Sequence, residues 1–388
     1  LILHGDTYDE AYRRARQLES EWGLTFIHPF DDPLVIAGQG TIGREILHQV
    51  DGKVHAVFVP IGGGGLIAGI ATYIKSINPD IRVIGVEPED SSAMRDSLAA
   101  GHPVTLDHVG IFADGVAVRR VGDETFRLCR QFVDEVITVS TDQTCAAIRD
   151  IFEDTRSIVE PAGALAVAGL KKYVAEHGLT DKTLVAVNGG ANVNFDRLRH
   201  IAERAAVGEQ REMLIAVEIP ERPGSFRTFC EAIGKRSVTE FNYRYSDATR
   251  AHIFVGVELR HGAKERHELI AKLRELGYPV ADLSDNEVAK LHVRHMVGGR
   301  AGTLRDERLF RFEFPERPGA LLDFLKAIGT KWNISLFHYR NHGSDYGRIL
   351  AGIQVPEDEA AELEAHLAEL GYAHSEESRN PAYEMFLA

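Results

Sequence analysis

The C-terminal half of this chain carries the same sequence pattern twice, and this internal repeat limits the possible folds more than any other feature. Four blocks recur in the same order, with an offset of 95 residues between Leu214 and Leu309. The longest pair is LIAVEIPERPGSFRTFCEAIG (214–234) and LFRFEFPERPGALLDFLKAIG (309–329), and FNYR, IFVGVEL and LRELGY of the first copy match FHYR, ILAGIQV and LAELGY of the second. Each copy is therefore expected to form one unit of the same fold.

The order of apolar and polar residues within each copy predicts a strand, a Pro-Gly turn, a helix, two strands, a second helix and a short last strand. We place the two repeated domains at 213–286 and 308–388. The segment 287–307 is polar and contains glycines, which is typical of a connector, and 206–212 has the composition of a linker.

The N-terminal half, 1–205, alternates short apolar runs with helical patterns. Strand–helix–strand units of roughly 30 residues predict an α/β domain with a parallel sheet covered by helices on both faces. We expect strands at Leu1–Leu3, Phe26–His28, Val54–Val59, Ile81–Glu87, Glu135–Val139 and Thr183–Val187. We expect one helix from a capping box of Thr7 and Glu10 to Glu21, and others at Thr41–His48, Leu66–Lys75, Thr141–Glu153 and Gly163–His177.

Composition limits the possible partners. The formal net charge of -14 argues against a nucleic-acid or membrane-surface partner, because both require a basic face. The three cysteines, Cys129, Cys145 and Cys230, lie far apart without a C-x-x-C motif, so we expect reduced thiols in a cytoplasmic protein and no metal site. No apolar run approaches the roughly 18 residues that a membrane span requires.

The chain opens on LILHGD, whose apolar triplet predicts a strand with neighbours on both sides. Chain termini are more often polar and frayed. We therefore expect the sequence to begin inside a domain whose first part precedes Leu1.

Two glycine-rich runs are candidate anion sites. Gly38–Gly43 fits the pattern G-x-G-x-x-G, and Gly63, Gly65 and Ala68 fit its G-x-G-x-x-A variant. Glu87 ends a strand at the distance expected for a ribose contact. A dinucleotide site is therefore one hypothesis, and glycines that only permit tight turns and close packing are the other.

The run Gly62–Gly65 has a more specific pattern. Four consecutive glycines between a strand and a helix allow successive N–H groups to face one ligand. The helix from Leu66 adds its own N–H groups and the positive end of its dipole. This arrangement favours a compact phosphate monoester over a pyrophosphate.

Four segments of the N-terminal half together resemble the fold-type II pyridoxal-phosphate enzymes: DPLVIAGQGTIGRE (32–45), VPIGGGGLIAGIA (59–71), VEPAGALA (159–166) and GANVNFDRLR (190–199). With the tandem repeat, essentially the whole chain resembles the biosynthetic threonine dehydratase family. This resemblance implies a partial α/β catalytic domain with a parallel sheet, followed by two α+β, ferredoxin-like domains of the ACT-like type. It favours pyridoxal phosphate over NAD as the cofactor.

The resemblance also implies a reaction and a set of contacts. Enzymes of this family deaminate L-threonine, with L-serine as an alternative substrate, to 2-oxobutanoate and ammonia in isoleucine biosynthesis. The phosphate-binding loop of the family falls on Gly62, Gly63, Gly64, Gly65 and the N–H group of Leu66. Glu160 falls near the cofactor ring by the same matching, and a carboxylate that only stabilises a helix N-terminus is the alternative interpretation.

The sequence departs from the family pattern at two places. The Schiff-base lysine of the family belongs to an S-F-K-x-R type motif, whereas the lysines of 1–205 all have surface or linker settings: Lys53, Lys75, Lys171, Lys172 and Lys182. The family usually places a serine beside the ring nitrogen, and the matching position is Gly189. The contact to the ring nitrogen is therefore lost, or water or Asn188 replaces it. A turn residue is the alternative interpretation of Asn188. The chain alone is therefore expected to be a poor catalyst or inactive.

The two repeats resemble the ACT-like regulatory modules of the same family, for which the resemblance implies inhibition by isoleucine, relief by valine and a homotetramer. The turns at Pro223-Gly224 and Pro318-Gly319 precede predicted helices, where N–H groups can receive a carboxylate. Hydroxyl and guanidinium contacts to the effector are expected from four residues of the following strands: Tyr243, Arg244, Tyr339 and Arg340. Aromatic packing of the sheet against its helices is the alternative role.

Two other hypotheses remain for the whole chain. It is either a non-catalytic amino-acid sensor that retains a vestigial lyase half, or a dinucleotide-dependent enzyme built on Gly63, Gly65 and Glu87. Binding of NAD without binding of pyridoxal phosphate would support the second of these hypotheses over the pyridoxal-phosphate enzyme.

Overall fold

The computed structural model describes residues 1–5, 8–296, 298, 301, 304–315, 319–340, 346–381, 383 and 387. Contacts divide the chain into two compact units, Leu1–Gly208 and Glu209–Ala388. The first unit ends with helix α8 (Phe195–Gly208), and strand β5 (Glu212–Pro220) opens the second. Thr7 of the expected capping box and Pro318 of the second Pro-Gly turn lie outside the described residues.

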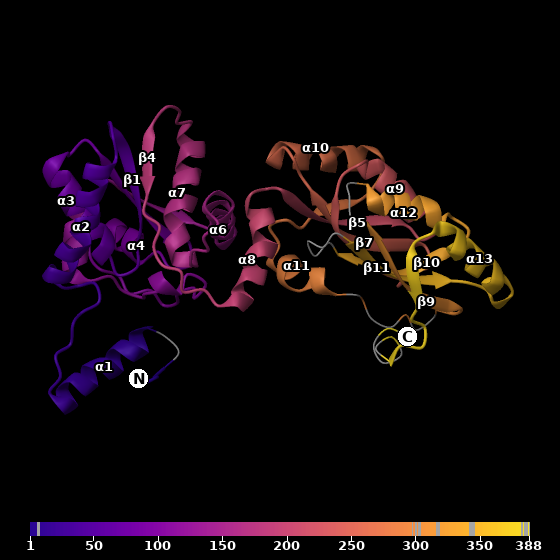
Figure 1. The fold of residues 1–388 in the computed structure, drawn as a ribbon, viewed down its shortest axis with the longest axis horizontal. Coiled ribbons are helices and arrows are strands. Elements are labelled where there is room, and N and C mark those ends of the chain that lie inside the picture. Colours follow the sequence, from indigo (N-terminus) through magenta and orange to yellow (C-terminus); the bar gives the residue numbers. More distant parts are fainter. Residues whose placement is uncertain are drawn as a thin grey trace. The chain divides into compact units, whose positions relative to one another are not determined.

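The N-terminal unit is built on a four-stranded sheet with the order β3-β2-β1-β4 (Figure 1). All neighbouring strands are parallel, as predicted. Its strands confirm four of the expected ones: β1 (Val54–Pro60), β2 (Arg82–Pro88), β3 (Glu135–Val139) and β4 (Thr183–Ala186). The central strand β1 is almost entirely buried, which explains its nearly continuous apolar sequence.

Helices cover both faces of this sheet, because successive side chains of β1 point in opposite directions (Figure 1). Phe58 packs among α6 (Thr141–Thr155), α7 (Pro161–His177) and α8, whereas Val57 packs among α2 (Pro33–Gln49), α3 (Gly65–Ile77) and α5 (Asp123–Phe132). The remaining elements of the unit are α1 (Tyr8–Trp22), α4 (Ala93–Ala100) and the short helix η1 (Asp114–Val116).

Two predicted strands of this unit were wrong. Leu1–Leu3 has no regular structure, and its side chains find no neighbours to bury them. Phe26–His28 also forms no strand, since the Phe26 ring packs edge-on against Tyr12 of α1, 5.4 Å between ring centroids.

Helix α2 begins at Pro33, well before the predicted Thr41. The carboxylate of Asp32 accepts hydrogen bonds from the N–H groups of Leu34 and Val35, and a proline at the first helical position is already fixed in a helical φ. The run Gly38–Gly43 consequently lies inside a helix.

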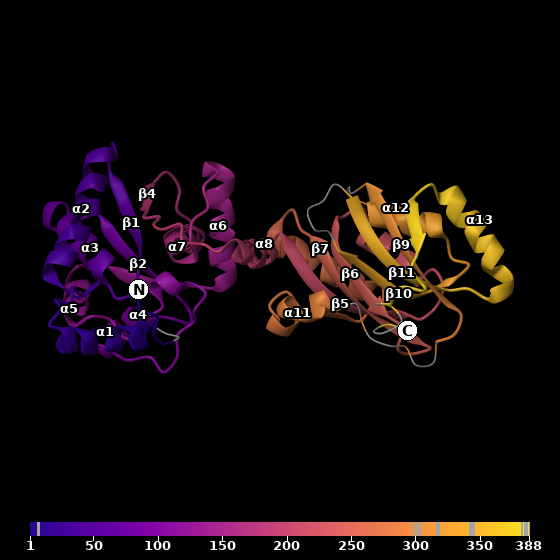
Figure 2. The same cartoon turned by 60° about the horizontal axis from the view of Figure 1, so that its bottom comes forward.

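The C-terminal unit is one eight-stranded sheet with the order β12-β9-β11-β10-β6-β7-β5-β8 (Figure 2). Each copy has the predicted order of elements: β5, α9, β6, β7, α10 and β8, then β9, α12, β10, β11, α13 and β12. The strands of the first copy are β5, β6 (Val238–Arg244), β7 (Arg250–Glu258) and β8 (Val280–Asp282). Those of the second are β9 (Glu307–Pro315), β10 (Asn333–Arg340), β11 (Tyr346–Gln354) and β12 (Ala373–Glu376).

The copies join where β6 pairs antiparallel with β10, so that Tyr243 lies opposite Phe337 and Phe241 lies opposite Tyr339. The two repeats therefore share a continuous sheet and a common core.

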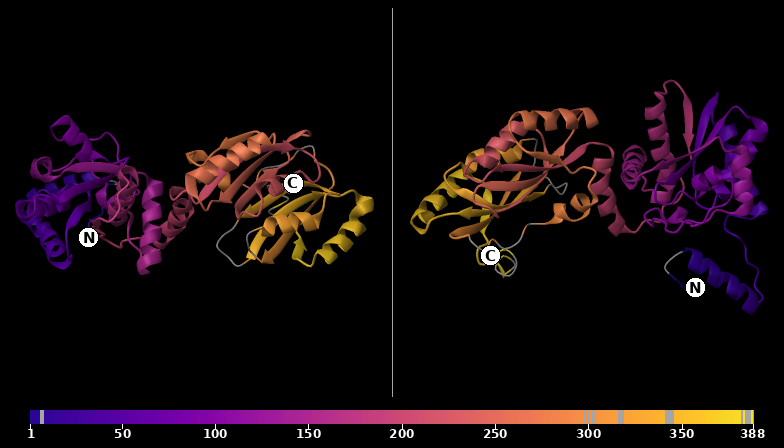
Figure 3. Two further views of the ribbon diagram at one scale, coloured as in Figure 1. Left: turned by 90° about the horizontal axis from the view of Figure 1, so that it is seen from above. Right: turned by 180° about the vertical axis from the view of Figure 1, so that it is seen from behind.

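Helices α9 (Ser225–Ile233), α10 (Gly262–Glu275), α12 (Ala320–Ile328) and α13 (Ala360–Leu370) pack on one face of this sheet (Figures 1 and 3). The short helix α11 (Glu287–Leu291) of the predicted connector packs on the other face, where Ala289 contacts Leu214 and Phe254.

A buried carboxylate recurs at the same place in both copies. Glu212 accepts a hydrogen bond from the Thr239 hydroxyl, and Glu307 accepts one from Ser335 at the corresponding position. In each copy a glycine leaves the necessary room, because a Cβ on Gly256 or on Gly352 would lie 3.2 or 2.6 Å from the carboxylate oxygen.

Each carboxylate also faces a buried arginine. The Arg294 guanidinium of the connector lies 3.4 Å from Glu212 and 2.7 Å from Glu240, a second carboxylate that is fully buried. The connector is therefore fixed to the sheet by buried charges, which its polar sequence did not indicate.

No helix in the described part of the chain is both long enough and apolar enough to cross a lipid bilayer.

Candidate functional site

A cavity of about 400 Å³ opens in the N-terminal unit beside the four-glycine loop. Its walls come from the loop itself, the segment before α2, the η1 region and the start of α7. The lining residues are Tyr8, Pro29, Phe30, Gln39, Pro60, Gly62–Leu66, Asp114–Val118, Glu160, Ala162, Gly163 and Gly189. All seven residues that the sequence proposed as cofactor contacts thus line one cavity.

The glycine loop presents N–H groups at the start of α3. Gly64 caps this helix with φ 98°, a conformation that favours glycine. The first hydrogen bond of the helix runs from the Ala68 N–H to the Gly64 carbonyl, so the N–H groups of Gly65 and Leu66 precede the helical ladder. The loop can therefore receive an anion at the positive end of the helix dipole.

Neighbouring side chains hold this loop in place. The Thr125 hydroxyl donates a hydrogen bond of 2.7 Å to the Gly63 carbonyl, and a Cβ on Gly63 would lie 2.3 Å from the Phe30 ring. Asp31 fixes Phe30 by accepting hydrogen bonds from the N–H groups of Glu124 and Thr125 at the start of α5. Sequence reasoning missed these supports, because they join segments that are distant in the sequence.

Glu160 stands at the N-terminus of α7, but its side chain makes no capping bond to that helix. Its Oε2 atom accepts a hydrogen bond of 3.0 Å from the Asn192 N–H, and a Cβ on Gly190 would lie 2.2 Å from the carboxyl group. The carboxylate therefore holds the Gly-Gly-Ala-Asn loop against the cavity.

Gly189 and Gly163 have opposite surroundings. A Cβ on Gly189 would meet no atom within 4 Å, so the departure from serine at this position leaves open space in the cavity wall. A Cβ on Gly163 would lie 1.8 Å from the Gly189 carbonyl oxygen. Only glycine at 163 lets α7 approach the loop this closely.

We predict that Gly163→Ala lowers the free energy of unfolding of the N-terminal unit by about 1–3 kcal/mol, because the new methyl group displaces the Gly189 backbone. Gly189→Ala, the matched control in the same cavity, should change it by less than about 0.5 kcal/mol. Urea unfolding followed by circular dichroism measures both values, and equal stabilities of the two variants would contradict the close packing at Gly163.

No lysine lines this cavity. All five lysines of the N-terminal unit lie among its described residues and are engaged or exposed elsewhere. Lys75 pairs with Asp134 at 2.7 Å, Lys171 with Asp150, and Lys172 donates to the Thr138 carbonyl, while Lys53 and Lys182 are exposed. The cavity thus contains no amine that can bind an aldehyde.

Of the residues of the dinucleotide hypothesis, Gly63 and Gly65 line the cavity, whereas Glu87 and the run Gly38–Gly43 have structural roles. Gly40 packs against the Gly69 backbone where α2 crosses α3. Glu87 is fully buried and accepts hydrogen bonds from the N–H groups of Met94 and Arg95 at the start of α4, while burial raises its pKa to about 7. Glu87 does not line the cavity, so the geometry required for a ribose contact is absent from the described residues.

The four proposed effector residues are mostly occupied by internal contacts. Tyr243 is buried, and its hydroxyl donates a hydrogen bond to Glu221 of the first Pro-Gly turn. The Arg244 guanidinium lies 2.5 Å from the Glu307 carboxylate and donates a hydrogen bond of 2.5 Å to the Leu387 carbonyl. Tyr339 is buried beside a void of about 10 Å³ between α9 and α12. The Arg340 guanidinium lies 2.8 Å from His295.

Comparison with known proteins gives matches for both units. Residues 1–190 match the family "Pyridoxal-phosphate dependent enzyme", and residues 203–293 and 298–387 match the "C-terminal regulatory domain of Threonine dehydratase". The chain is 58% identical over 388 residues to "L-threonine dehydratase biosynthetic IlvA" of Burkholderia multivorans, covering 100% of this chain and 76% of that protein. Its identity to the Escherichia coli protein of the same name is 56%, with 75% of that protein covered.

A solved structure gives the same result for the fold. The processed form of threonine deaminase isoform 2 from Solanum lycopersicum is 46% identical, with a TM-score of 0.52 over 53% of this chain and 56% of that chain. The glycine-lined cavity, the tandem repeat and these sequence identities all indicate the same family. The chain belongs to the biosynthetic threonine dehydratases, pyridoxal-phosphate-dependent enzymes that carry a C-terminal regulatory domain.

Proposed function

We propose that this protein serves the deamination of L-threonine, with L-serine as an alternative substrate, to a 2-oxo acid and ammonia. The observation that carries this proposal is the cavity beside Gly62–Gly65, in a chain whose relatives are named threonine dehydratases. When bound, pyridoxal phosphate supplies a conjugated ring that takes up electrons from the amino acid Cα as its proton leaves.

The lining residues fit this cofactor. The Cβ side of the glycine loop is filled, since added Cβ atoms would lie 3.0 Å from Val116 at Gly62 and 2.7 Å from Met94 at Gly64. The N–H groups at the start of α3 are then available for the phosphate. In this proposal Glu160 and Gly189 lie beside the ring, and Gly189 leaves the ring nitrogen to water.

Binding of pyridoxal phosphate tests the loop separately from activity. Gly64→Ala should weaken binding at least tenfold in equilibrium dialysis, because alanine disfavours φ 98° and its methyl group would lie 2.7 Å from Met94. Gly52→Ala is the matched control: Gly52 also has positive φ, at 90°, but lies outside the cavity and has open space around its Cβ position. Equal affinity of the two variants would contradict the phosphate role of the loop.

The surroundings of the lysines predict that these 388 residues bind pyridoxal phosphate without a covalent bond. Borohydride treatment followed by mass spectrometry should find no lysine that carries the cofactor. A modified lysine in the N-terminal unit would overturn this part of the proposal.

We further propose that isoleucine inhibits and valine relieves inhibition through the C-terminal unit, in a cytoplasmic homotetramer. The match to a regulatory domain supports this, and Tyr339 beside the void between α9 and α12 is the proposed effector contact. The void of about 10 Å³ holds one water at most, so effector binding requires α9 and α12 to separate. Absence of isoleucine binding in calorimetry would contradict the proposed inhibition by isoleucine. A monomeric sedimentation coefficient would contradict the proposed homotetramer.

A further inference from the structure

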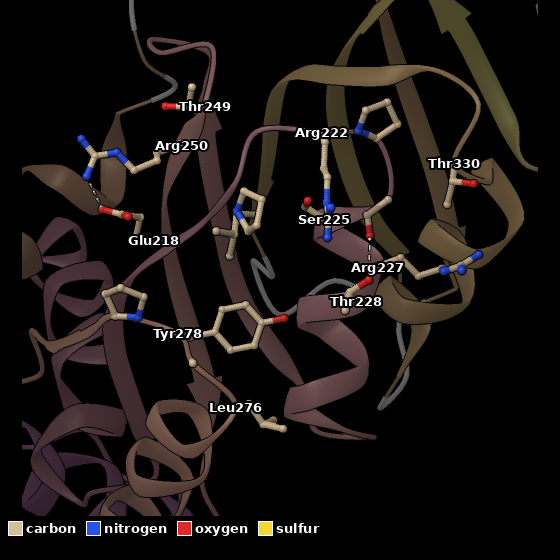
Figure 4. A pocket seen from close by; sticks show the side chains of 16 residues that line it. Glu218, Arg222, Ser225, Arg227, Thr228, Thr249, Arg250, Leu276, Tyr278 and Thr330 are labelled. Atoms are coloured by element: carbon tan, nitrogen blue, oxygen red, sulfur yellow. Dashed lines mark hydrogen bonds and ion pairs between the residues drawn. The ribbon is translucent and has the colours of Figure 1, made fainter.

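A second and larger cavity, about 650 Å³, lies in the C-terminal unit at the start of α9 (Figure 4). It is formed by the turn between β5 and α9, the beginning of β7 and the segment that follows α10, with Thr330 of the second copy at one side. Its lining includes none of the four proposed effector side chains, but it does include the Pro223-Gly224 turn, where the sequence predicted a carboxylate contact.

A buried hydroxyl without a partner marks this cavity. Ser225 is the first residue of α9, is only 7% exposed and lines the cavity. Its Oγ atom has no hydrogen-bond partner among the described residues. A buried hydroxyl left unpaired costs stability, so its presence beside a cavity and a helix N-terminus indicates a ligand atom.

The charges around the cavity select the type of ligand. Three arginines line it, Arg222, Arg227 and Arg250, against one acidic residue, Glu218. Glu218 already lies 3.6 Å from Arg250 and 3.4 Å from His252, whereas Arg222 forms no ion pair within the described residues. The cavity therefore attracts an anion and has no unpaired carboxylate for an ammonium group.

The second repeat provides an internal comparison. At the positions of Ser225, Arg227 and Thr228 it carries Ala320, Leu322 and Asp323. Apolar side chains thus replace the serine hydroxyl and the arginine guanidinium, and a carboxylate replaces the threonine hydroxyl. The fold of the repeat therefore does not require these three polar side chains, which belong to the first copy alone, whereas Arg222 has a counterpart in Arg317.

We propose that this cavity binds a small organic anion that has a carboxylate but no ammonium group, as in a 2-oxo acid. The carboxylate accepts hydrogen bonds from the N–H groups of Phe226 and Arg227 and from the Ser225 hydroxyl, and it pairs with Arg222. Leu276 and Tyr278 (Figure 4), together with Pro279, provide an apolar wall for the carbon chain. This ligand differs in charge from the zwitterionic effectors proposed above.

Two probes with the same carbon chain test this assignment on the full chain by isothermal titration calorimetry. 2-Oxobutanoate should bind at least tenfold more tightly than L-2-aminobutanoate, because three arginines repel the ammonium group of the latter and Glu218 already pairs with Arg250 and His252. Ser225→Ala should weaken 2-oxobutanoate binding about tenfold. It should not lower the melting temperature, since Oγ has no partner to lose.

Gly64→Ala in the N-terminal cavity is the control for location, and it should leave 2-oxobutanoate binding unchanged. If Gly64→Ala abolishes binding while Ser225→Ala retains it, the anion lies in the N-terminal cavity and the proposal is wrong. Two other results would make this cavity an amino-acid site and overturn the proposal. One is equal affinity for the two probes. The other is displacement of 2-oxobutanoate by isoleucine that Ser225→Ala abolishes.

Discussion

Arg294→Met is expected to lower the free energy of unfolding of the C-terminal unit by about 3–5 kcal/mol. Arg294 is 5% exposed and faces two carboxylates, Glu212 at 3.4 Å and Glu240 at 2.7 Å. Methionine has a similar length but no charge, so the variant buries both carboxylates without compensation. Loss of the guanidinium also releases the connector that carries Arg294 from the sheet.

Denaturant unfolding at pH 8 measures this effect, since this pH lies above the raised pKa of Glu240. Arg311→Met is the matched control: its side chain is 56% exposed and pairs with Glu377 at 3.4 Å, so a change within about 0.5 kcal/mol is expected. If Arg294→Met is as stable as the control, protons rather than the guanidinium neutralise the buried carboxylates.

The second large effect concerns the pH dependence of Glu240. This residue has no counterpart in the second copy, where Leu336 stands at the same position. The pKa of Glu240 is raised from 4.5 to about 7, because burial and the neighbouring Glu212 together outweigh the attraction of Arg294 and Arg340. The folded protein therefore retains a proton that the unfolded chain loses.

The sign of the effect follows from this difference. Between about pH 4.5 and pH 7 the folded state binds more protons, so its stability falls as the pH rises and stays lower above pH 7. The loss is at most about 3 kcal/mol for this shift. Glu240→Gln removes the ionisation and keeps the shape, so this variant should match the wild-type protein near pH 5 and exceed its stability at pH 8.

Chemical unfolding at several pH values between 5 and 8 provides the measurement. Glu376→Gln is the control, because Arg308 lowers the pKa of Glu376 and its titration falls below this range. If Glu240→Gln is less stable than the wild-type protein at pH 8, the ion pair with Arg294 outweighs the cost of burial and the predicted direction is wrong.

Much of the architecture could be predicted from local patterns. Strand β1 reads as an apolar run because both of its faces are buried, and the repeat identified the elements of the C-terminal unit in order. Leu1–Leu3 and Phe26–His28 failed because an apolar triplet becomes a strand only where a neighbouring strand supplies hydrogen bonds. The early start of α2 was missed, although Asp32 and Pro33 give a capping signal in the sequence.

The candidate site was predicted in part. Gly62–Leu66 line the cavity because a strand–turn–helix junction has a fixed local geometry, whereas Glu160 and Gly189 reach it from the start of α7 and from the segment after β4. The supports of that loop, Phe30, Asp31 and Thr125, come from distant segments and left no local pattern. Tyr243 and Arg244 were proposed for an effector, and the structure instead gives them Glu221 and Glu307 as partners.

The sequence by itself determined the repeat, the glycine loop at the start of α3 and the absence of a lysine motif, because these depend on residues close together in the chain. Only the tertiary structure decided which glycines face a cavity and which permit helix packing, as Gly63 and Gly40 illustrate. It also decided that Arg294 neutralises buried carboxylates and that the Ser225 hydroxyl has no partner. Burial and charge compensation depend on groups that are distant in sequence, and only the folded chain brings them together.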